Sequence, residues 1–517
     1  MTTVAVSLFR SLLIYGICVP LALMLGYLIT TPDDLTSFTF VGGVLMLLLI
    51  PLLLRWHHAW LFATWNMTVV LFFLPGQPLV WLALVWISLL IGLVGYMLNR
   101  NRRFLHVPEL SKPLILMAIV VLVTAKFTGG FGMRSFGSDT IGAKRYFIVL
   151  SSIAGYFALT SQQIPRHRVP LYVALYFLGA ITMAVGELAT VVSPGFYWLF
   201  AIFPVHSAGL QAIANDPRAQ AGFAARLGGL ATAASGGYLL MLCRYGIRGL
   251  FGFRRMGRLI ILVGLVIVAM LGGFRSTLIL LLLTFVILFY LEGLLRSPLF
   301  PALLLVGLLG SLIVLPVTDR LPVVVQRSLS FLPVAIDPVV KASAESSTEW
   351  RVQMWKHVLP DVPEYLLLGK GYSMTAKDLA MARIMGPGTT GSESSELAGD
   401  YHNGPLSVIV PFGIPGTVAF IWFLAAGFKV LRRNYIFGDP AFHGINTFLL
   451  AYFTARVILF FLVFGGLYSD LAIFIGLIAL SVSINGGMAR KAAAPAQRVM
   501  VINRFKLQPP GTKPVAA

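Results

Sequence analysis

Apolar runs of membrane-spanning length recur along almost the whole chain. Of its 517 residues, 58% are hydrophobic and only 11% are charged, whereas soluble domains carry about 25% charged residues. Apolar runs of about 17–25 residues cross a bilayer as helices, which satisfy their own backbone hydrogen bonds where lipid cannot. About fourteen such runs occur, at 8–29, 38–54, 58–74, 78–98, 113–128, 145–162, 170–192, 227–243, 259–273, 276–292, 298–316, 406–431, 445–467 and 471–488. We therefore expect an all-α, polytopic integral membrane protein with about 14 transmembrane helices.

The basic residues are placed in a pattern that predicts orientation. A net charge of +20 could suggest nucleic acid, but the arginines and lysines gather in alternate short loops. Examples are the clusters at 100–112, 166–168, 244–258 and 432–433. Cytoplasmic loops are enriched in these residues. The pattern therefore predicts that both termini are cytoplasmic and that the long loop 317–405 is periplasmic, which requires an even number of spans.

The chain divides into three parts by composition and motif content. Residues 1–254 contain transmembrane runs and no motif that indicates chemistry. Residues 255–488 hold the remaining runs and the loop 317–405. Residues 489–517 are rich in alanine, proline and lysine and are expected to form a disordered cytoplasmic tail with a basic start. Because the chain has no internal repeat of fixed period, an inverted-repeat transporter is disfavoured.

The long loop must carry recognition or chemistry, because helices that face lipid cannot. Within it we expect a helix from about residue 343 to residue 359, capped by Ser346 or Ser347. Helical spacing relates its apolar residues Trp350, Met354 and Val358.

Two arginines are candidates for binding an anion at the outer face. Arg275 follows two glycines at a tight bend between apolar segments, and a charge at membrane depth costs at least a few kcal/mol unless it has a partner or reaches water. Arg351 lies on the expected loop helix. A guanidinium can bind a diphosphate bidentately. The competing interpretations are an arginine that reaches lipid head groups for Arg275 and a solvated surface charge for Arg351.

His402 is the candidate base. Its unperturbed pKa lies near 6.5, so a neutral imidazole at pH 7 can remove a proton from a sugar hydroxyl; the competing interpretation is a helix-capping loop histidine. Asn403 follows it, and after nine intervening residues Gly413 and Gly416 predict a broken or closely packed start to the next helix. Such a break can hold backbone groups beside a site. Lys370, in a Gly-Lys-Gly turn of the loop, is a weaker basic candidate.

Together these residues resemble one family. The segment from His402 to Gly416, with its histidine–asparagine pair and its two spaced glycines, is similar to the signature of the O-antigen ligase family. These membrane glycosyltransferases share a domain with the O-antigen polymerases. Arg275 and Arg351 resemble the two arginines that the family carries, and the turn at Lys370 is also typical. The resemblance covers about residues 255–470.

The resemblance implies a GT-C-like membrane fold and a reaction. A glycan carried on undecaprenyl diphosphate would be transferred to an acceptor hydroxyl at the periplasmic face of the bacterial inner membrane. Arg275 and Arg351 would bind the diphosphate and stabilise its developing charge, while His402 would activate the acceptor. The supporting residues would be Asn403, Gly413, Gly416 and Lys370. The transfer would invert the anomeric carbon and need no metal or other cofactor, and no nucleic acid would take part.

Several alternatives remain open at this level. A polymerase would extend a lipid-linked chain, whereas a ligase would move the chain to lipid A-core, and the same motif serves both. A metal-dependent transferase could use Asp33-Asp34, although this short segment also fits a plain turn. A flippase or transporter of lipid-linked glycans would need charges deep in the bundle. Glu187 and Arg456 are candidates for that role, with mutual pairing as the simpler interpretation.

Overall fold

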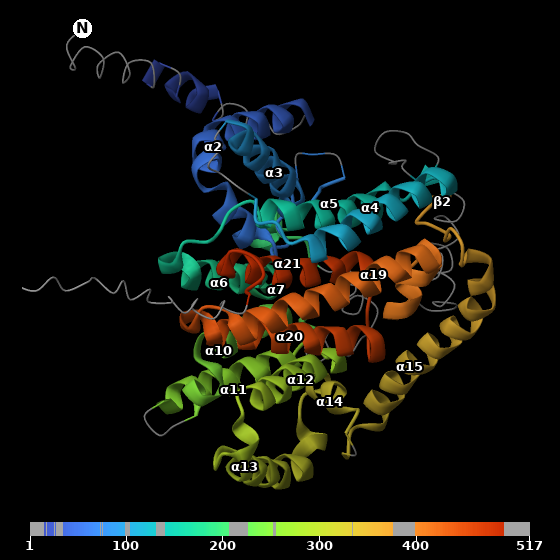
Figure 1. Ribbon diagram of the computed structural model, residues 1–517. Coiled ribbons are helices and arrows are strands. Elements are labelled where there is room, and N and C mark those ends of the chain that lie inside the picture. The colour runs from blue at the N-terminus through green and yellow to red at the C-terminus, as the bar shows by residue number, and fades with distance from the viewer. Residues whose placement is uncertain are drawn as a thin grey trace, which may run out of the picture.

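The structure is a computed structural model, and it is almost entirely helical over the residues that it describes (Figure 1). These are residues 15–16, 18–24, 26, 35–72, 74, 76–98, 104–130, 140–205, 226–251, 255–332, 334–375 and 399–490. Asp33-Asp34, most of the run 8–29 and residues 491–517 of the expected tail lie outside this part of the chain. Within it, the strands are two residues long.

The elements follow in an order that alternates long apolar helices with short connections. The α-helices are α2 (Leu35–Thr64), α3 (Val80–Leu98), α4 (Pro108–Thr128), α5 (Ala143–Leu159), α6 (Val169–Leu178), α7 (Thr182–Val192), α10 (Gly228–Leu250), α11 (Met256–Met270), α12 (Arg275–Leu291), α13 (Leu299–Val314), α14 (Val323–Leu329), α15 (Pro338–Val358), α19 (Gly404–Phe437), α20 (His443–Leu462) and α21 (Leu467–Asn485). The 3-10 segments are η2 (Arg166–Arg168), η3 (Gly179–Ile181), η4 (Pro194–Ala201), η6 (Leu294–Arg296), η7 (Leu315–Arg320), η8 (Leu359–Tyr365) and η9 (Pro440–Phe442). Strand β1 (Thr140–Ile141) pairs with β2 (Met374–Thr375) in antiparallel orientation.

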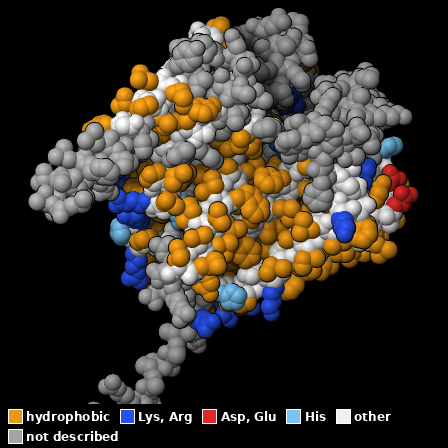
Figure 2. All heavy atoms as spheres, turned by 90° about the horizontal axis from the view of Figure 1, so that it is seen from above, with side chains coloured by type: hydrophobic (Ala, Val, Ile, Leu, Met, Phe, Trp, Pro, Cys, Tyr) orange, Lys and Arg blue, Asp and Glu red, His pale blue; other side chains and the backbone are white. Residues whose placement is uncertain are grey.

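Helices of membrane-spanning length confirm the fold class. In the described part of the chain, seven helices are long and apolar enough to cross a bilayer, and α11 and α12 are shorter apolar helices. Figure 2 shows one face of the molecule on which hydrophobic side chains cover the middle and Lys and Arg lie toward the margins. The protein is therefore an all-α, polytopic membrane protein. The number of fourteen spans stays a prediction.

One pair of expected spans is wrong. Helix α2 contains the run 38–54 together with residues 58–64 of the next run, and it passes through Pro51 without a break. It ends at Thr64, and residues 67–69 are not helical. Apolar character alone could not separate one long helix from two. The two histidines near its C-terminal end are buried and hydrogen-bonded: His57 Nδ1 lies 2.8 Å from the Ser88 hydroxyl, and His58 Nε2 lies 2.7 Å from the Leu159 carbonyl oxygen.

One hydrophobic core runs through both halves of the chain. Helices α19, α20 and α21 lie in its middle, with α4 and α5 on one side and α10 and α12 on the other (Figure 1). Large side chains such as Phe420, Phe423 and Phe474 are fully buried there. By contrast, α13 has no buried residue and lies at the edge of the bundle. The N-terminal helices thus form part of the same packed body as the helices that carry the candidate site.

Loops gather at two opposite ends of the bundle. At one end, Arg166 pairs with Asp439, and the backbone N–H of Ile164 donates to the Ser483 carbonyl at 2.9 Å. At the other end, the pairing of β1 with β2 joins the loop before α5 to the long loop, and α15 crosses the helix ends (Figure 1). This grouping agrees with the alternation of basic loops in the sequence. The assignment of the two ends to cytoplasm and periplasm stays a prediction.

Candidate functional site

The bend between α11 and α12 presents Arg275 at the first turn of α12. Gly273 makes this bend with a φ of 66°, a conformation that glycine adopts without steric cost. A Cβ atom at Gly273 would lie 3.2 Å from Val324, and 3.7 Å from both Arg226 and Arg327. The Arg275 guanidinium is held from the long loop, because its Nη2 donates to the Ala344 carbonyl at 3.2 Å and to the Thr348 hydroxyl at 3.1 Å.

Helix α14 brings Arg327 to the same bend. The buried Ser328 hydroxyl donates to the Met270 carbonyl at 2.9 Å, which ties α14 to the end of α11. Gln326 is also buried, and its amide donates to the carbonyls of Asp319 and Leu321 at 2.9 and 2.8 Å. These bonds satisfy polar groups inside an irregular segment, so the position of Arg327 is fixed by its two neighbours in sequence.

Helix α15 positions Arg351, and it confirms the expected loop helix. It begins earlier than expected, because the Asp337 carboxylate caps it by accepting from the Val339 N–H at 2.7 Å; the expected caps at Ser346 and Ser347 are wrong. Its apolar spacing is confirmed, since Met354 and Val358 are buried and Trp350 packs against the same cluster. That cluster includes three residues at the start of the next helix region, Tyr401, Leu406 and Val410. Packing therefore places Arg351 beside the segment that carries His402.

The four arginines line one cavity of about 300 Å³. They are Arg226, Arg275, Arg327 and Arg351. No carboxylate lies among the described residues that line it. Burial lowers the pKa of Arg226 and of Arg351, the latter also beside Arg275, although Asp400 acts in the opposite direction. Burial and the three neighbouring arginines lower the pKa of Arg327 to about 10. Such a concentration of like charge suits a multivalent anion.

His402 lies beside this cavity in an unusual backbone conformation. Its φ is 47°, a left-handed value that costs non-glycine residues energy and that histidine adopts more often than most. Its ring centroid lies 5.3 Å from those of both Trp350 and Phe464, and the Arg351 guanidinium lies 5.7 Å from the same Phe464 ring. Phe464 therefore touches the candidate base and one of the cavity arginines.

The surroundings keep the imidazole neutral. Burial lowers the pKa of His402, Arg351 lowers it further, and Asp400 acts in the opposite direction. His402 Nδ1 is buried and accepts or donates no hydrogen bond among the described residues, while Asp400 Oδ1 lies 3.7 Å away. That distance is too long for a hydrogen bond, yet it is short enough to stabilise an imidazolium. If the imidazole gained a proton, the nearby Asp400 carboxylate would stabilise the positive charge that results.

Asn403 has a structural part in this geometry. Its side-chain oxygen accepts from the Leu406 N–H at 3.1 Å, so it caps α19 directly after His402. Such caps are worth about 1 kcal/mol. Gly404 follows, where a Cβ would lie 2.2 Å from the Phe460 carbonyl oxygen. The start of α19 is thus fixed by a cap and by close packing against α20.

The expected break in the next helix is confirmed. Gly413 has φ 60° and ψ −161° inside α19, and the Ile414 N–H beyond it donates to the Leu366 carbonyl at 2.7 Å. The Gly-Lys-Gly turn docks against this break, since the Lys370 N–H donates to the Val410 carbonyl at 2.8 Å. The Lys370 side chain lies over the Tyr365 ring and does not line the arginine cavity. A Cβ on Gly416 would lie 2.2 Å from the Cβ of Phe412. Asn403, Gly413, Gly416 and Lys370 therefore have local structural contacts at the start and the break of α19, and their support of a catalytic site stays a prediction.

Two cavity residues have no place in the sequence prediction. Arg226 lies just before α10 and Arg327 lies on the short helix α14, neither in a recognisable motif, and only the fold brings them to Arg275. Their signal is weak: Arg226 stands directly before an apolar run, as Arg275 does.

The charged pair considered for transport does not form. The Glu187 carboxylate is buried and accepts from the N–H groups of Gly229 and Leu230 at 2.7 and 3.0 Å, so it caps α10. Arg456 instead pairs with Asp470 at 3.4 Å. Both charges therefore have local structural partners.

No metal centre is evident in the described ranges, where no group of three or more His, Cys, Asp or Glu could hold an ion. Asp33-Asp34, the residues of the metal-dependent alternative, lie outside those ranges.

The fold and the cavity define a polytopic, all-helical membrane protein with an arginine-lined cavity at one end of its helix bundle. Residues 260–421 match the family model described as O-antigen ligase. Over this range the chain is similar to the O-antigen ligase family, and the range lies within the 255–470 expected and contains Arg275, Arg351 and His402. No curated protein matches the chain.

Proposed function

We propose that the protein transfers a glycan from undecaprenyl diphosphate to an acceptor hydroxyl at the periplasmic face of the bacterial inner membrane. The acceptor is lipid A-core in a ligase or the end of a growing surface polysaccharide in a polymerase. The matched family supports glycan transfer. The observation that carries the proposal is the cavity in which four arginines converge beside His402.

The arginine cavity accounts for donor binding and leaving-group stabilisation. Arg275 and Arg351 line the cavity from different elements, one on α12 and one on α15. A diphosphate between them would accept charge-assisted hydrogen bonds from both sides. As the glycosidic bond breaks, negative charge grows on the departing diphosphate, and fixed guanidinium groups stabilise it without reorganising. The arginines therefore act most strongly in the transition state.

His402 accounts for activation of the acceptor. Its lowered pKa keeps the imidazole neutral and able to accept a proton from a sugar hydroxyl. Asp400, at 3.7 Å from Nδ1, would stabilise the imidazolium that results. The hydroxyl oxygen then attacks the anomeric carbon as the diphosphate departs from its opposite face, in one displacement that inverts the configuration. Neither role calls for a metal ion or another cofactor.

The function is tested by a purified transfer assay and by the glycans of cells that lack the protein. Transfer from a synthetic lipid-linked donor in EDTA should proceed at the rate measured without EDTA. Loss of activity that magnesium or manganese restores would contradict the metal-independent mechanism. In deletion cells, complete chains left on undecaprenyl diphosphate identify a ligase and single repeat units identify a polymerase. A normal glycan profile would overturn the proposal.

A further inference from the structure

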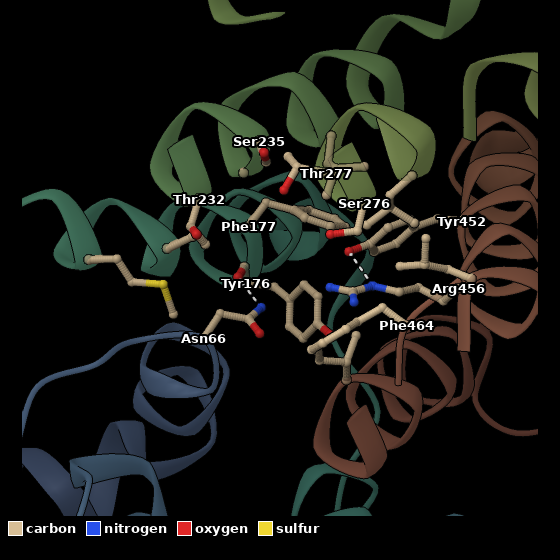
Figure 3. A pocket seen from close by; sticks show the side chains of 17 residues that line it. Asn66, Tyr176, Phe177, Thr232, Ser235, Ser276, Thr277, Tyr452, Arg456 and Phe464 are labelled. Atoms are coloured by element: carbon tan, nitrogen blue, oxygen red, sulfur yellow. Dashed lines mark hydrogen bonds between the residues drawn. The ribbon is translucent and has the colours of Figure 1, made fainter. Parts of the chain in front are cut away.

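A second cavity of about 280 Å³ adjoins the arginine cavity inside the helix bundle. Its wall is formed by residues of α6, α7, α10, α12 and α20 (Figure 3). Ser276 lines both cavities, and Phe464 lines the inner one while its ring contacts His402 and Arg351. The inner cavity, as we call it, therefore touches the proposed diphosphate site through Ser276 and the candidate base through Phe464.

Two hydroxyl groups at the start of α12 face the inner cavity without a partner. Ser276 and Thr277 line it, and their side chains make no hydrogen bond to the part of the chain that the structure describes. The cavity hydroxyls of α10 differ, because Thr232 and Ser235 donate to carbonyls of their own helix at 2.8 Å. The first two hydroxyls are thus available to a ligand, and the other two are engaged.

The opposite wall carries a fixed cation. Arg456 points toward the centre of the cavity in Figure 3. Its Nε donates to the Tyr452 hydroxyl at 3.1 Å, and its Nη1 lies 3.4 Å from the Asp470 carboxylate. These contacts hold the guanidinium in place, so it can orient a polar ligand at little further cost in side-chain entropy.

Tyr176 also lines the inner cavity. Its hydroxyl is buried and has no hydrogen-bond partner among the described residues. The nearby Asn66 amide donates instead to the Tyr176 carbonyl, at 2.7 Å. Leaving a buried hydroxyl unpaired costs about 1–3 kcal/mol. Only glycine at position 476 leaves room for it, since a Cβ there would lie 2.6 Å from the hydroxyl oxygen.

We propose that the inner cavity binds one sugar ring of the lipid-linked donor, the ring attached directly to the diphosphate. This inference rests on the proposed function. The carbon that is transferred must lie next to both the diphosphate and the activated acceptor, and the inner cavity adjoins the residues assigned to each. Aromatic walls from Phe177 and Phe464 fit the apolar face of a sugar, and Thr277 and Arg456 fit its hydroxyl edge. The volume suits a single ring and excludes an oligosaccharide.

The test compares two ligands in purified protein: undecaprenyl diphosphate with its glycan, and undecaprenyl diphosphate without a sugar. Thr277→Val and Tyr176→Phe each remove one hydroxyl from the cavity with little change in shape. Each variant should weaken binding of the glycan-bearing ligand about tenfold, the loss of one hydrogen bond. Binding of the sugar-free ligand should stay unchanged. The melting temperature of Tyr176→Phe should stay equal or rise, because an unpaired buried hydroxyl is removed.

Matched controls exist for both variants. Thr284→Val lies on the same helix, but its hydroxyl donates to the Leu280 carbonyl and does not line the cavity. Tyr156→Phe also removes a buried hydroxyl without a partner among the described residues, and Tyr156 lies on α5 outside the cavity. Neither control should change the affinity for either ligand.

Two results would overturn the sugar subsite. Equal weakening of both ligands would mean that the cavity holds lipid or diphosphate, and unchanged binding of both would mean that it holds water only. Arg275→Ala separates this failure from failure of the proposed function. That variant should weaken the sugar-free ligand as well, and normal binding of both ligands to Arg275→Ala would contradict the diphosphate site itself.

Discussion

Burial and the neighbouring Arg226, Arg275 and Arg351 lower the pKa of Arg327 to about 10, which shows how close to Arg327 the other three arginines lie. A residue that only snorkelled to lipid head groups would point away from its neighbours. Arg275 instead turns to the Ala344 carbonyl and the Thr348 hydroxyl of the long loop, and Arg351 has a buried Nε without a described partner. Both guanidinium groups are therefore held beside the cavity, where a bound anion would supply further hydrogen-bond acceptors.

Replacement of the two assigned arginines should lower turnover. Arg275→Ala and Arg351→Ala each remove a fixed donor from the departing diphosphate, so kcat/KM should fall about 10²–10³-fold, or about 2.7–4 kcal/mol. Lysine should restore it only in part, because an ammonium lacks the bidentate fork. Arg320→Ala, an exposed arginine of η7 outside the cavity, serves as the control. Near-normal kcat/KM in both cavity variants at normal expression would refute their role.

His402 should act as a base with a shifted pH profile. His402→Ala and His402→Gln should each lower the rate about 10²–10⁴-fold, because neither side chain accepts a proton near neutral pH. Binding of undecaprenyl diphosphate should remain. In the wild type, protonation of the imidazole removes the base, and the lowered pKa delays this loss. The acid limb of kcat/KM should therefore have its midpoint below 6.5. His357→Ala is the loop control, and substantial activity in the glutamine variant would assign His402 to acceptor orientation.

At the scale of elements, the site depends on three pieces that meet end to end. The broken helix α19, the Gly-Lys-Gly turn and α15 are joined by backbone hydrogen bonds at Gly413 and Lys370 and by the small cluster around Met354. None of these contacts involves a ligand. These backbone hydrogen bonds and the Met354 cluster fix the positions from which His402 and Arg351 both contact the Phe464 ring.

A side chain at the break should disrupt this arrangement. Gly413→Ala places a Cβ 2.5 Å from the Leu366 carbonyl oxygen at a φ of 60°. The combined strain should cost at least about 1–3 kcal/mol, seen as a lower melting temperature in detergent together with lost transfer. Gly444→Ala is the control, because a Cβ there meets nothing within 4 Å at the start of α20. An unchanged melting temperature for Gly413→Ala would show that the break tolerates repacking.

Sequence patterns predicted these elements to different degrees. Helical spacing predicted α15 through Met354 and Val358, and glycine and proline predicted the break at Gly413. The cap at Asp337 was not predicted, because serine–glutamate spacing further along fits a cap equally well. Local patterns also carry no information on which distant segments meet. Arg226 and Arg327 reach Arg275 only through tertiary packing, which no local pattern describes.

At the scale of the whole molecule, the loops sort to the two ends of the bundle. The Arg166–Asp439 pair lies at one end and the paired strands β1 and β2 at the other. The hydrophobic pattern predicted the all-α membrane class because lipid imposes it on any spanning chain. It could not predict that one apolar stretch would form α2 alone, because apolar character does not report where a helix ends.

Cysteine labelling should assign the two ends to sides of the membrane. With Cys18 and Cys243 replaced, a cysteine at residue 375 should react with an impermeant reagent from outside. Cysteines at residue 255 and at the C-terminus should react only after the membrane is opened, as positive-inside loops require. Reaction of residue 375 from the cytoplasmic side alone would place the arginine cavity on the wrong face for the proposed donor.

The arginine cavity also has a consequence for the catalytic cycle after transfer. In the proposed reaction, the diphosphate that leaves the sugar would carry more negative charge than it did in the donor, and it would remain among the same fixed guanidinium groups. The groups proposed to accelerate bond cleavage would then also slow the departure of the spent carrier lipid. We expect turnover to be limited by this release and inhibited by undecaprenyl diphosphate. Removal of that lipid by the cell would then reduce the inhibition. The rate of carrier recycling would therefore limit the rate of glycan transfer.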